Sequence, residues 1–328
     1  MHRVLVIGVG SIGERHVRTF AATKRVTLGI CEALDERRRD VAGRYGIERT
    51  HERLEDIAPT HYDAAVIATP AHLHIPMANQ LAQAGWHLLI EKPLSISQAG
   101  VAELKARLEA SGRVTAIGYN LRAHPAVAAL RKAIHERRFG RPMQLIFVGG
   151  QHFPTFRPAY REVYYRDRAQ GGGAIQDGLT HYLNTAEWIV GPTTSVAADA
   201  THARLEGVEV EDTVHVIARH GDVLATYSLN QHQAPNETTL SVVCEHGTCQ
   251  MQFHHSRWRW QSDPAAQWEE ERFEGLERDT QYITQAHAFL DAVEGKRQPL
   301  CTFAEAEQTL RTQLAILKSA DGDSLRAV

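Results

Sequence analysis

Three groups of residues have the types and the spacing that a chemical site needs. Gly8–Gly13 reads G-x-G-x-x-G, a pattern that brings backbone N–H groups close to a bound phosphate. Lys92 follows an apolar run, and Asp177 and His181 stand at positions i and i+4. An ammonium group, a carboxylate and an imidazole can each give, take or steer a proton. The sequence therefore indicates a phosphate-binding turn near the N-terminus and proton-transfer groups farther along the chain.

The glycine pattern gains meaning from its surroundings. It follows an apolar run and opens a stretch with helical spacing, and Glu32 ends the next apolar run about 20 residues farther on. In this dinucleotide-binding fingerprint Gly8 allows the tight turn, Gly10 admits the pyrophosphate to the backbone, and Gly13 lets the helix pack on the strand. The first N–H groups of the helix then face the phosphates.

The residues around Glu32 bear on which dinucleotide binds. A carboxylate at this place would accept hydrogen bonds from the adenosine ribose hydroxyls and repel a 2′-phosphate, which favours NAD. Arg37, Arg38 and Arg39 come directly afterwards and could bind that phosphate instead, or simply form the solvated face of a helix. We predict NAD as the preferred cofactor, with NADP as the alternative.

Lys92 and the Asp177–His181 pair each allow a plainer interpretation. Lys92 could act on a reacting oxygen, or it could be a surface lysine paired with Glu91. If the segment around Asp177 is helical, its carboxylate and the His181 imidazole share one face, and the aspartate can fix the imidazole tautomer. Asp177 could equally be a helix N-cap and His181 a packing residue. The glycines at 171–173 favour close approach of the backbone to a ligand, although a flexible loop also uses such glycines.

The composition argues against several classes of protein. The 328 residues suffice for about two domains, and the formal net charge of −3 provides no basic field for nucleic acid or an acidic membrane surface. No apolar run approaches the ~18 residues of a membrane span, and the first run is too short for a signal peptide. The scatter of the 4 cysteines predicts reduced thiols in a cytoplasmic protein. Cys244 and Cys249 could belong to a zinc site, but a hairpin with incidental thiols is favoured, and we predict no metal.

The order of apolar and polar runs indicates the fold class. Apolar runs alternate with helical stretches over the first ~120 residues, which predicts βαβ units and a parallel sheet covered on both faces. Period-2 runs at short spacing between Val196 and Phe253 predict antiparallel strands. We therefore predict an α/β protein, with a Rossmann doubly wound parallel sheet in residues 1–121 and an α+β domain with a largely antiparallel open sheet in residues 122–328.

Taken together, the motifs resemble the glucose–fructose oxidoreductase / inositol dehydrogenase / MocA-like family. The resemblance covers essentially the whole chain and rests on motifs that occur in the family's order. The matching segments are GVGSIGERH at 8–16, ATPAHLH at 68–74, EKPLS at 91–95, GYNLRAHP at 118–125, GGGAIQDGLTH at 171–181 and AHAFLDAVEGKRQPLCTFAEAEQTL at 286–310.

The resemblance implies which residues form the site. The Lys of the family's E-K-P motif and the Asp and His of its glycine-rich motif carry over onto Lys92, Asp177 and His181 as catalytic residues. His124 and Ala71 depart from the family's usual residues, which could alter the pocket floor and remove one polar contact to the cofactor. The predicted cofactor-binding residues are Gly8, Gly10, Ser11, Ile12, Gly13, Glu32, Thr69, Pro70, His74, Glu91, Lys92 and Asn120. The predicted substrate-binding residues are Lys92, Arg122, Gln151, Arg157, Tyr164, Asp177 and His181.

The segment 151–166 is the expected specificity element. Aromatic faces stack on sugar rings, and arginines bind hydroxyls, carboxylates or phosphates. A mobile surface loop is the alternative interpretation.

The resemblance implies reversible hydride transfer between the nicotinamide and a secondary alcohol or ketone of a sugar, cyclitol or sugar derivative. His181, held by Asp177, would accept the hydroxyl proton while Lys92 hydrogen-bonds the same oxygen, or Lys92 would transfer the proton itself. The alternatives are a non-catalytic dinucleotide-binding regulatory protein of the same fold, an NAD-dependent glycosidase, and an oxidoreductase that acts on a non-sugar carbonyl or a diol. The family also implies a homodimer or homotetramer formed through the C-terminal sheet.

Overall fold

The computed structural model describes residues 1–322 and divides into two compact units. The first unit contains Met1–Ala123 and Glu277–Glu307, and the second contains His124–Leu276 and the chain from Gln308 onward. The predicted boundary after residue 121 lies close to this division. The prediction differs from the structure for residues 277–307, which it assigned to the second domain. The last residues of that predicted domain, 323–328, lie outside the described residues.

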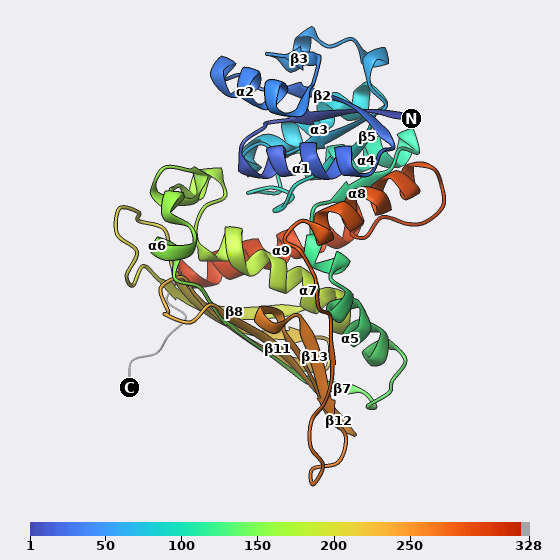
Figure 1. Ribbon diagram of the computed structural model, residues 1–328. Helices are drawn as coiled ribbons and strands as arrows, with labels where there is room; N and C mark the ends of the chain where they lie inside the picture. Colours follow the sequence, from blue (N-terminus) through green and yellow to red (C-terminus); the bar gives the residue numbers. More distant parts are fainter. Residues whose placement is uncertain (323–328) are drawn as a thin grey trace. The chain divides into compact units, whose positions relative to one another are not determined.

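Residues 277–307 belong to the first unit because helix α8 (Thr280–Val293) lies beside α1 (Ser11–Ala22) (Figure 1). The carboxylate of Asp279 accepts a hydrogen bond from Arg18 Nη2 at 2.8 Å, and Phe289 packs edge-on against Phe20 at 6.1 Å. Both contacts join residues that are far apart in the sequence. Local patterns therefore gave no sign of them.

The first unit contains a six-stranded parallel sheet with the strand order β3-β2-β1-β4-β5-β6 (Figure 1). In its central strands, residues 4–7 and 64–67 are buried apolar runs, as expected for strands covered on both faces. The predicted doubly wound sheet is confirmed. The strands are β1 (His2–Ile7), β2 (Val26–Cys31), β3 (Arg49–His51), β4 (Ala64–Ile67), β5 (His87–Ile90) and β6 (Thr115–Ile117), and the longer helices are α1, α2 (Asp35–Tyr45), α3 (His74–Gln83), α4 (Val101–Ser111) and α8. The short helices are η1 (Leu54–Asp56), η2 (Pro59–His61), η3 (Ala71–Leu73) and η4 (Asn120–Ala123).

The second unit contains an eight-stranded sheet with the order β14-β13-β12-β11-β7-β10-β9-β8. All neighbouring strands are antiparallel except β7 and β10, so the predicted largely antiparallel sheet is confirmed. The strands are β7 (Pro142–Gly150), β8 (Ser195–Thr201), β9 (Thr213–His220), β10 (Val223–Asn230), β11 (Glu237–Cys244), β12 (Gly247–Gln252), β13 (Arg257–Gln261) and β14 (Glu269–Arg272).

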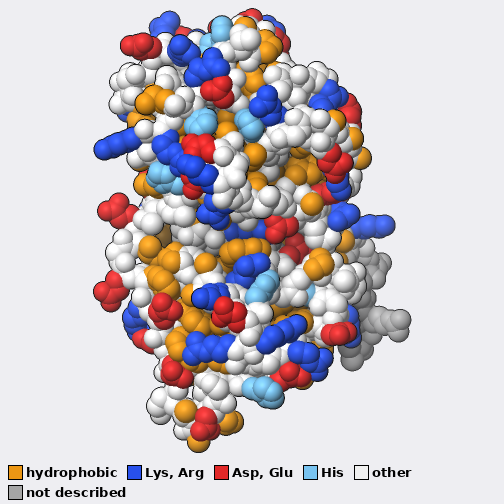
Figure 2. Space-filling model, turned by 90° about the vertical axis from the view of Figure 1, so that its right-hand side faces the viewer, with side chains coloured by type: hydrophobic (Ala, Val, Ile, Leu, Met, Phe, Trp, Pro, Cys, Tyr) orange, Lys and Arg blue, Asp and Glu red, His pale blue; other side chains and the backbone are white. Residues whose placement is uncertain are grey.

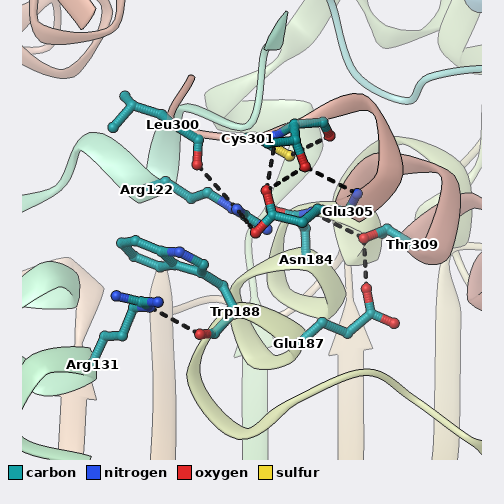
Figure 3. A network of polar contacts seen from close by, with 10 residues as sticks. Arg122, Arg131, Asn184, Glu187, Trp188, Leu300, Cys301, Glu305 and Thr309 are labelled. Carbon is teal, nitrogen blue, oxygen red and sulfur yellow. Dashed lines mark hydrogen bonds and ion pairs between the residues drawn. The ribbon is translucent and has the colours of Figure 1, made fainter. Parts of the chain in front are cut away.

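One face of this sheet is covered by α5 (Pro125–His135), α7 (Thr180–Val190) and the later part of α9 (Phe303–Ala320) (Figure 1). Figure 3 shows how α7 is joined to α9: Asn184 donates to the hydroxyl of Thr309 at 2.9 Å, and that hydroxyl donates to Glu187 at 2.6 Å. The remaining helices are short: α6 (Phe153–Phe156), η5 (Pro158–Arg161), η6 (Tyr164–Arg166), η7 (Arg168–Gln170), the π-helix η8 (Ala174–Leu179) and η9 (Phe253–His255).

Cys244 and Cys249 lie on the hairpin of β11 and β12, and both thiols are buried. The structure thus has the hairpin that the sequence favoured. Within residues 1–322 no group of three or more His, Cys, Asp or Glu side chains could hold a metal ion. None of the described helices is both long enough and apolar enough to cross a membrane.

Candidate functional site

The glycine turn of the first unit is closed on one side and open on the other. A Cβ atom at Gly13 would lie 1.8 Å from the carbonyl oxygen of Gly8, so only glycine fits where α1 passes over the turn. Gly8 has φ +77°, a conformation that favours glycine. A Cβ atom at Gly10 would meet nothing within 4 Å, and no side chain caps the N-terminus of α1 at Ser11. The turn therefore leaves space and free N–H groups for a phosphate.

Glu32 lies at the end of β2 and is turned toward the glycine turn. Its Oε2 accepts a hydrogen bond from the Val9 N–H at 3.0 Å, and its Oε1 accepts one from the Leu34 N–H at 3.1 Å. These two bonds hold the carboxylate beside the turn, where a ribose hydroxyl of a dinucleotide would need an acceptor.

The three arginines that follow Glu32 are all engaged with acidic groups. A guanidinium nitrogen of Arg37 lies 3.6 Å from Glu32 Oε2, and Arg38 donates to the Glu32 carbonyl at 2.6 Å. Arg38 and Arg39 also pair with Asp35. Each arginine that the NADP alternative would use is thus paired with a carboxylate.

His74 lies between the loops that follow β4 and β5. Its Nε2 is 2.9 Å from the Thr69 carbonyl and its Nδ1 is 2.9 Å from the Pro93 carbonyl. Burial lowers the pKa of His74 by more than these carbonyls raise it, so the neutral ring is favoured. The neutral ring has one N–H group and donates to one of the two carbonyls, and it packs between the loop of Thr69 and Pro70 and the segment that carries Lys92.

Lys92 follows β5 directly and is half-buried. The preceding Glu91 is only 4% exposed, and its Oε1 lies 2.6 Å from Nε2 of His16 on α1. Burial alone would raise the pKa of the Glu91 carboxyl, but the hydrogen bond with His16 and the charge of Lys92 outweigh it and hold this pKa below its ordinary value. Asn120, half-buried at the start of η4, follows the end of the neighbouring strand β6.

Arg122 is 3% exposed, and Figure 3 shows where its guanidinium lies. Nη1 donates to the Leu300 carbonyl at 3.0 Å and to Glu305 Oε1 at 2.6 Å. Burial alone would raise the pKa of Glu305, but Arg122 and the bonds from Thr302 lower it. These contacts give Arg122 a place inside the first unit, where it fixes the chain before α9.

His124, the departure from the family pattern, caps a helix in the second unit. Its Nδ1 accepts a hydrogen bond from the Ala126 N–H at 3.2 Å at the start of α5. Burial lowers its pKa to about 4, so the ring accepts in its neutral form.

Asp177 and His181 lie on either side of a change in helix type. Asp177, 5% exposed, belongs to the π-helix η8, and half-buried His181 lies in the first turn of α7. The sequence-based expectation required a helical segment here, and the structure has one, although its first part is a π-helix and not an α-helix. Such single-turn π-helices occur frequently at functional sites, because they redirect side chains without ending the helix.

The glycines before η8 pack against the protein's own chain. A Cβ atom at Gly172 would lie 2.1 Å from the Tyr165 carbonyl oxygen, and one at Gly173 would lie 2.4 Å from Oε1 of Glu211. The sequence offered ligand approach or a flexible loop as reasons for these glycines. Close internal packing is the reason that the structure gives.

Glu211 is a functional candidate that the sequence reasoning missed. Its Oε1 accepts a hydrogen bond from the Ile175 N–H at 3.1 Å, in the first turn of the π-helix that carries Asp177. Burial raises the pKa of Glu211, although this hydrogen bond and the charge of Arg168 oppose the shift. The only sequence signal was an acidic residue shortly before the run of alternating residues that begins at Thr213.

The segment 151–166 is anchored to the second unit by buried aromatic side chains. Phe153, Tyr160 and Tyr165 pack with Leu205 and two valines in a separate apolar cluster. Fully buried Asp212 fixes the chain around Leu205 of this cluster, because it accepts hydrogen bonds from the N–H groups of residues 203–205 at 2.7 to 2.9 Å. The anchoring argues against a freely mobile loop.

Hydrogen bonds join the predicted substrate residues of the second unit into two groups. The hydroxyl of exposed Tyr164 donates to Oδ1 of Asp177 at 2.7 Å, which connects the loop to the π-helix. Nε of Arg157 donates to Gln151 Oε1 at 3.3 Å, and Gln151 in turn donates to Asn236 at 3.3 Å. Tyr164 and Asp177 thus form one group, and Gln151 and Arg157 another.

Charged side chains show no separation by sign on the face seen in Figure 2. Basic and acidic residues lie interspersed among the described residues of that face. This distribution agrees with the formal net charge of −3.

Comparison with known proteins identifies the family to which these two units correspond. A family model described as the oxidoreductase family with an NAD-binding Rossmann fold matches residues 2–119, and a model of the GFO/IDH/MocA C-terminal domain matches residues 127–250. The chain is 26% identical to 1,5-anhydro-D-fructose reductase of Ensifer adhaerens, over 98% of this chain and 96% of that protein. It is 25% identical to inositol 2-dehydrogenase 4 of Saccharopolyspora erythraea, over 76% and 73%.

A solved structure has the same fold. Levoglucosan dehydrogenase in complex with NADH and levoglucosan superimposes with a TM-score of 0.89 at 23% identity, over 98% of this chain and 97% of that one. With both family models matched in order, the chain belongs to the GFO/IDH/MocA family of oxidoreductases, with an NAD-binding Rossmann domain followed by the family's C-terminal domain.

Proposed function

We propose that this protein is an NAD-dependent oxidoreductase that transfers a hydride between the nicotinamide and a secondary alcohol or ketone of a sugar, cyclitol or sugar derivative. The relatives support this class of substrate, because they include a reductase of an anhydro-sugar and an inositol dehydrogenase. The observation that carries the proposal is the glycine turn, which is open at Gly10 and uncapped at Ser11 beside the carboxylate of Glu32.

The residues of the turn fit a dinucleotide. Space for a pyrophosphate exists at Gly10, N–H groups of the first turn of α1 include those of Ser11 and Ile12, and Glu32 offers an acceptor to the ribose. When bound, NAD supplies the hydride acceptor. We propose that Thr69, Pro70, His74, Glu91, Lys92 and Asn120 complete the cofactor site, with His74 acting through the loops that it connects.

Lys92, Asp177 and His181 are the proposed catalytic residues. In the oxidising direction His181 accepts the proton of the substrate hydroxyl, and Lys92 donates a hydrogen bond to the same oxygen. Asp177 orients the imidazole, and the Tyr164 hydroxyl holds Asp177 through Oδ1. In the reducing direction the same groups return the proton to the carbonyl oxygen.

We propose that Gln151, Arg157 and Tyr164 contact the substrate. All three belong to the anchored segment 151–166, and a guanidinium beside an amide offers several donors to ring hydroxyls. For Arg122 we propose a positioning role, since its guanidinium is engaged by Glu305 and the Leu300 carbonyl.

The proposal is tested by following the absorbance of the reduced nicotinamide with a panel of inositols, aldoses, uronic acids and nucleotide sugars, using NAD and NADP in parallel. Reduction of NAD by at least one sugar or cyclitol is the expected result. Tight binding of NADH without turnover of any substrate would identify a regulatory protein instead. Release of sugar from a glycoside without net change in the nicotinamide absorbance would identify a glycosidase.

We further propose that the chain forms a homo-oligomer through the open face of the second sheet and works in the cytoplasm. Val148, Ile217 and Leu224 on β7, β9 and β10 are 53%, 64% and 47% exposed on that face, where isolated chains would leave apolar surface in water. Light scattering of wild type and I217E tests the assembly, and a monomeric wild type would contradict it. The four cysteines are buried thiols without disulfide bonds, which fits a reducing compartment.

A further inference from the structure

His16 has no part in the function proposed so far, and Glu91, which we place at the cofactor site, forms a buried pair with it. His16 is 1% exposed and lies on α1, the helix whose N-terminus forms the glycine turn. Glu91 lies at the end of β5, next to Lys92. Their side chains meet at 2.6 Å between Nε2 and Oε1, in the interior of the first unit. Burying an ionisable pair costs free energy, so such a pair often has a positional role.

The hydrogen bonds of His16 define how the pair works. Among the described residues, Nδ1 of His16 has no hydrogen-bond partner, whereas Nε2 faces the carboxylate. Because a carboxylate oxygen can only accept, Nε2 donates its proton to Glu91 Oε1. His16 is fixed in addition by the ring of Tyr282, which meets it edge-on at 5.9 Å.

The second carboxylate oxygen of Glu91 links the pair to the main chain of Lys92. Oε2 accepts the backbone N–H of Lys92 at 3.1 Å. The carboxylate also occupies the space above Gly118, where a Cβ atom would lie 2.8 Å from Oε1. Two hydrogen bonds, one with His16 and one with the Lys92 N–H, and packing against Gly118 therefore restrict the side chain of Glu91.

We propose that His16 and Glu91 form a positioning couple, which holds the main chain of Lys92 in a fixed relation to the helix that binds the cofactor's phosphates. Neither side chain touches the reacting atoms. This inference rests on the proposed function for the role of Lys92, but its hydrogen-bond geometry is independent of any activity.

The charges around the pair fit this role. The ammonium of Lys92 and the buried imidazole of His74 both interact electrostatically with Glu91. The phenol ring of Tyr282 faces His16, and the guanidinium of Arg15 lies over that ring at 4.9 Å. The cations favour an ionised Glu91, and its pKa is lowered even though burial opposes this. Without the hydrogen bond from His16, burial would dominate and the carboxyl would take up a proton at higher pH.

The test compares H16L with H16Q. Glutamine carries an amide Nε2 that can donate to Glu91, whereas leucine cannot. The matched controls are H220L and H220Q, because His220 is also buried and makes hydrogen bonds in the second unit, with the Gly191 carbonyl and with the hydroxyls of Tyr227 and Thr193. All four variants are compared in thermal stability, so that a general loss of folding is recognised.

The first measurement is amide hydrogen exchange at Lys92, which requires no activity. Exchange in H16L is expected to be at least about tenfold faster than in wild type, and H16Q and both His220 variants are expected to keep the wild-type rate. Equal protection in wild type and H16L would overturn the inference. This readout remains decisive if the protein turns over no sugar, so failure of the proposed function can be distinguished from failure of the couple.

The second measurement is the pH profile of kcat and of KM with an active substrate. H16L should lower kcat about tenfold with little change in the KM for NAD. In H16L the acid limb of the pH profile should also move to higher pH, because Glu91 takes up its proton at a higher pH than in wild type. H16Q should restore most of kcat and the position of the acid limb. A loss of kcat in H16Q equal to that in H16L, or the same shift in H220L, would contradict the inference.

Discussion

Glu91 in the first unit and Glu211 in the second are both buried carboxylates next to residues that we place in the reaction, yet their surroundings differ. His16 and the charge of Lys92 keep Glu91 ionised, and its pKa is lowered. Glu211 accepts a hydrogen bond from the Ile175 N–H, and a guanidinium nitrogen of Arg168 lies 3.5 Å from its Oε2. These interactions do not outweigh burial, so the pKa of Glu211 is raised. Glu91 thus acts as a buried charge, whereas Glu211 acts as a hydrogen-bond acceptor whose charge matters less.

The same contrast extends to the two candidate sites. In the first unit the ligand surface is mainly backbone, shaped by Gly8, Gly10 and Gly13 and by the end of α1. In the second unit it consists of side chains on a π-helix and on an anchored loop. Substitutions should therefore act through backbone geometry in one unit and through single hydrogen bonds in the other.

The largest effect is expected from G13A. The new Cβ atom would lie 1.8 Å from the Gly8 carbonyl oxygen, so the turn must open. Affinity for NADH, measured by fluorescence titration, should fall by a factor of about 100 or more, and the melting temperature should fall as well. G10A is the control, because its Cβ atom meets nothing within 4 Å: its melting temperature should match wild type while its NADH affinity drops. Full NADH affinity in G10A would show that no pyrophosphate lies against this residue.

The next effect is on stability, in D212A. Three backbone N–H groups lose their acceptor, which should lower the free energy of unfolding by about 3 kcal/mol in urea titrations. D199A, at an exposed position of β8, should change it by less than about 0.5 kcal/mol.

The same aspartate gives a pH dependence. Burial would raise the pKa of Asp212, but the N–H groups of residues 203–205 and the Thr213 hydroxyl lower it from its ordinary value of 3.8. Its contribution is therefore complete above pH 3.8 and is lost as the pH falls below that value. Wild type should lose more stability than D212A in this range. Parallel curves would mean that folding does not shift the pKa of Asp212.

A direct comparison of the two buried carboxylates is the third prediction. E91Q places an amide N–H₂ group against the N–H of Lys92 or against His16, so kcat should fall about tenfold. In E211Q the amide oxygen can still accept from Ile175, so kcat should fall by no more than about threefold. Equal losses in steady-state assays of the two variants would remove the contrast between the units.

The smallest effect is expected from Y164F. Only the hydrogen bond to Asp177 is lost, since the ring stays, and one such bond contributes about 1 kcal/mol, or about fivefold in kcat. The KM for the sugar should change less than kcat. If KM alone rises, Tyr164 acts on the substrate without acting through Asp177.

The sequence allowed the first unit to be predicted in more detail than the second. The order G-x-G-x-x-G followed by Glu32 depends on local backbone geometry, so spacing reveals it. The couple of His16 and Glu91 was not predicted, because it joins α1 to β5 across the sheet. The assignment of 277–307 failed for the same reason, since α8 packs on a helix that is distant in the sequence.

In the second unit the antiparallel strands followed from period-2 alternation, but the site did not. The i, i+4 spacing of Asp177 and His181 suggested an α-helix, because no sequence pattern marks a π-helix. Glu211 and Asp212 accept hydrogen bonds from other segments of the chain, and the alternation of polar and apolar residues does not predict where those segments lie. Side-chain sites of this kind require the tertiary structure.

The central claim is that Lys92 and the Asp177–His181 pair serve one chemical step. Single-turnover rates of K92A, H181A and the double variant, with saturating NAD and an active sugar, test it most directly. Each single variant should lower the rate about 100-fold, and the double variant should be much less impaired than the product of the two, because groups that act on one step are not additive. Near wild-type rates for either single variant, or fully multiplicative losses, would contradict the claim.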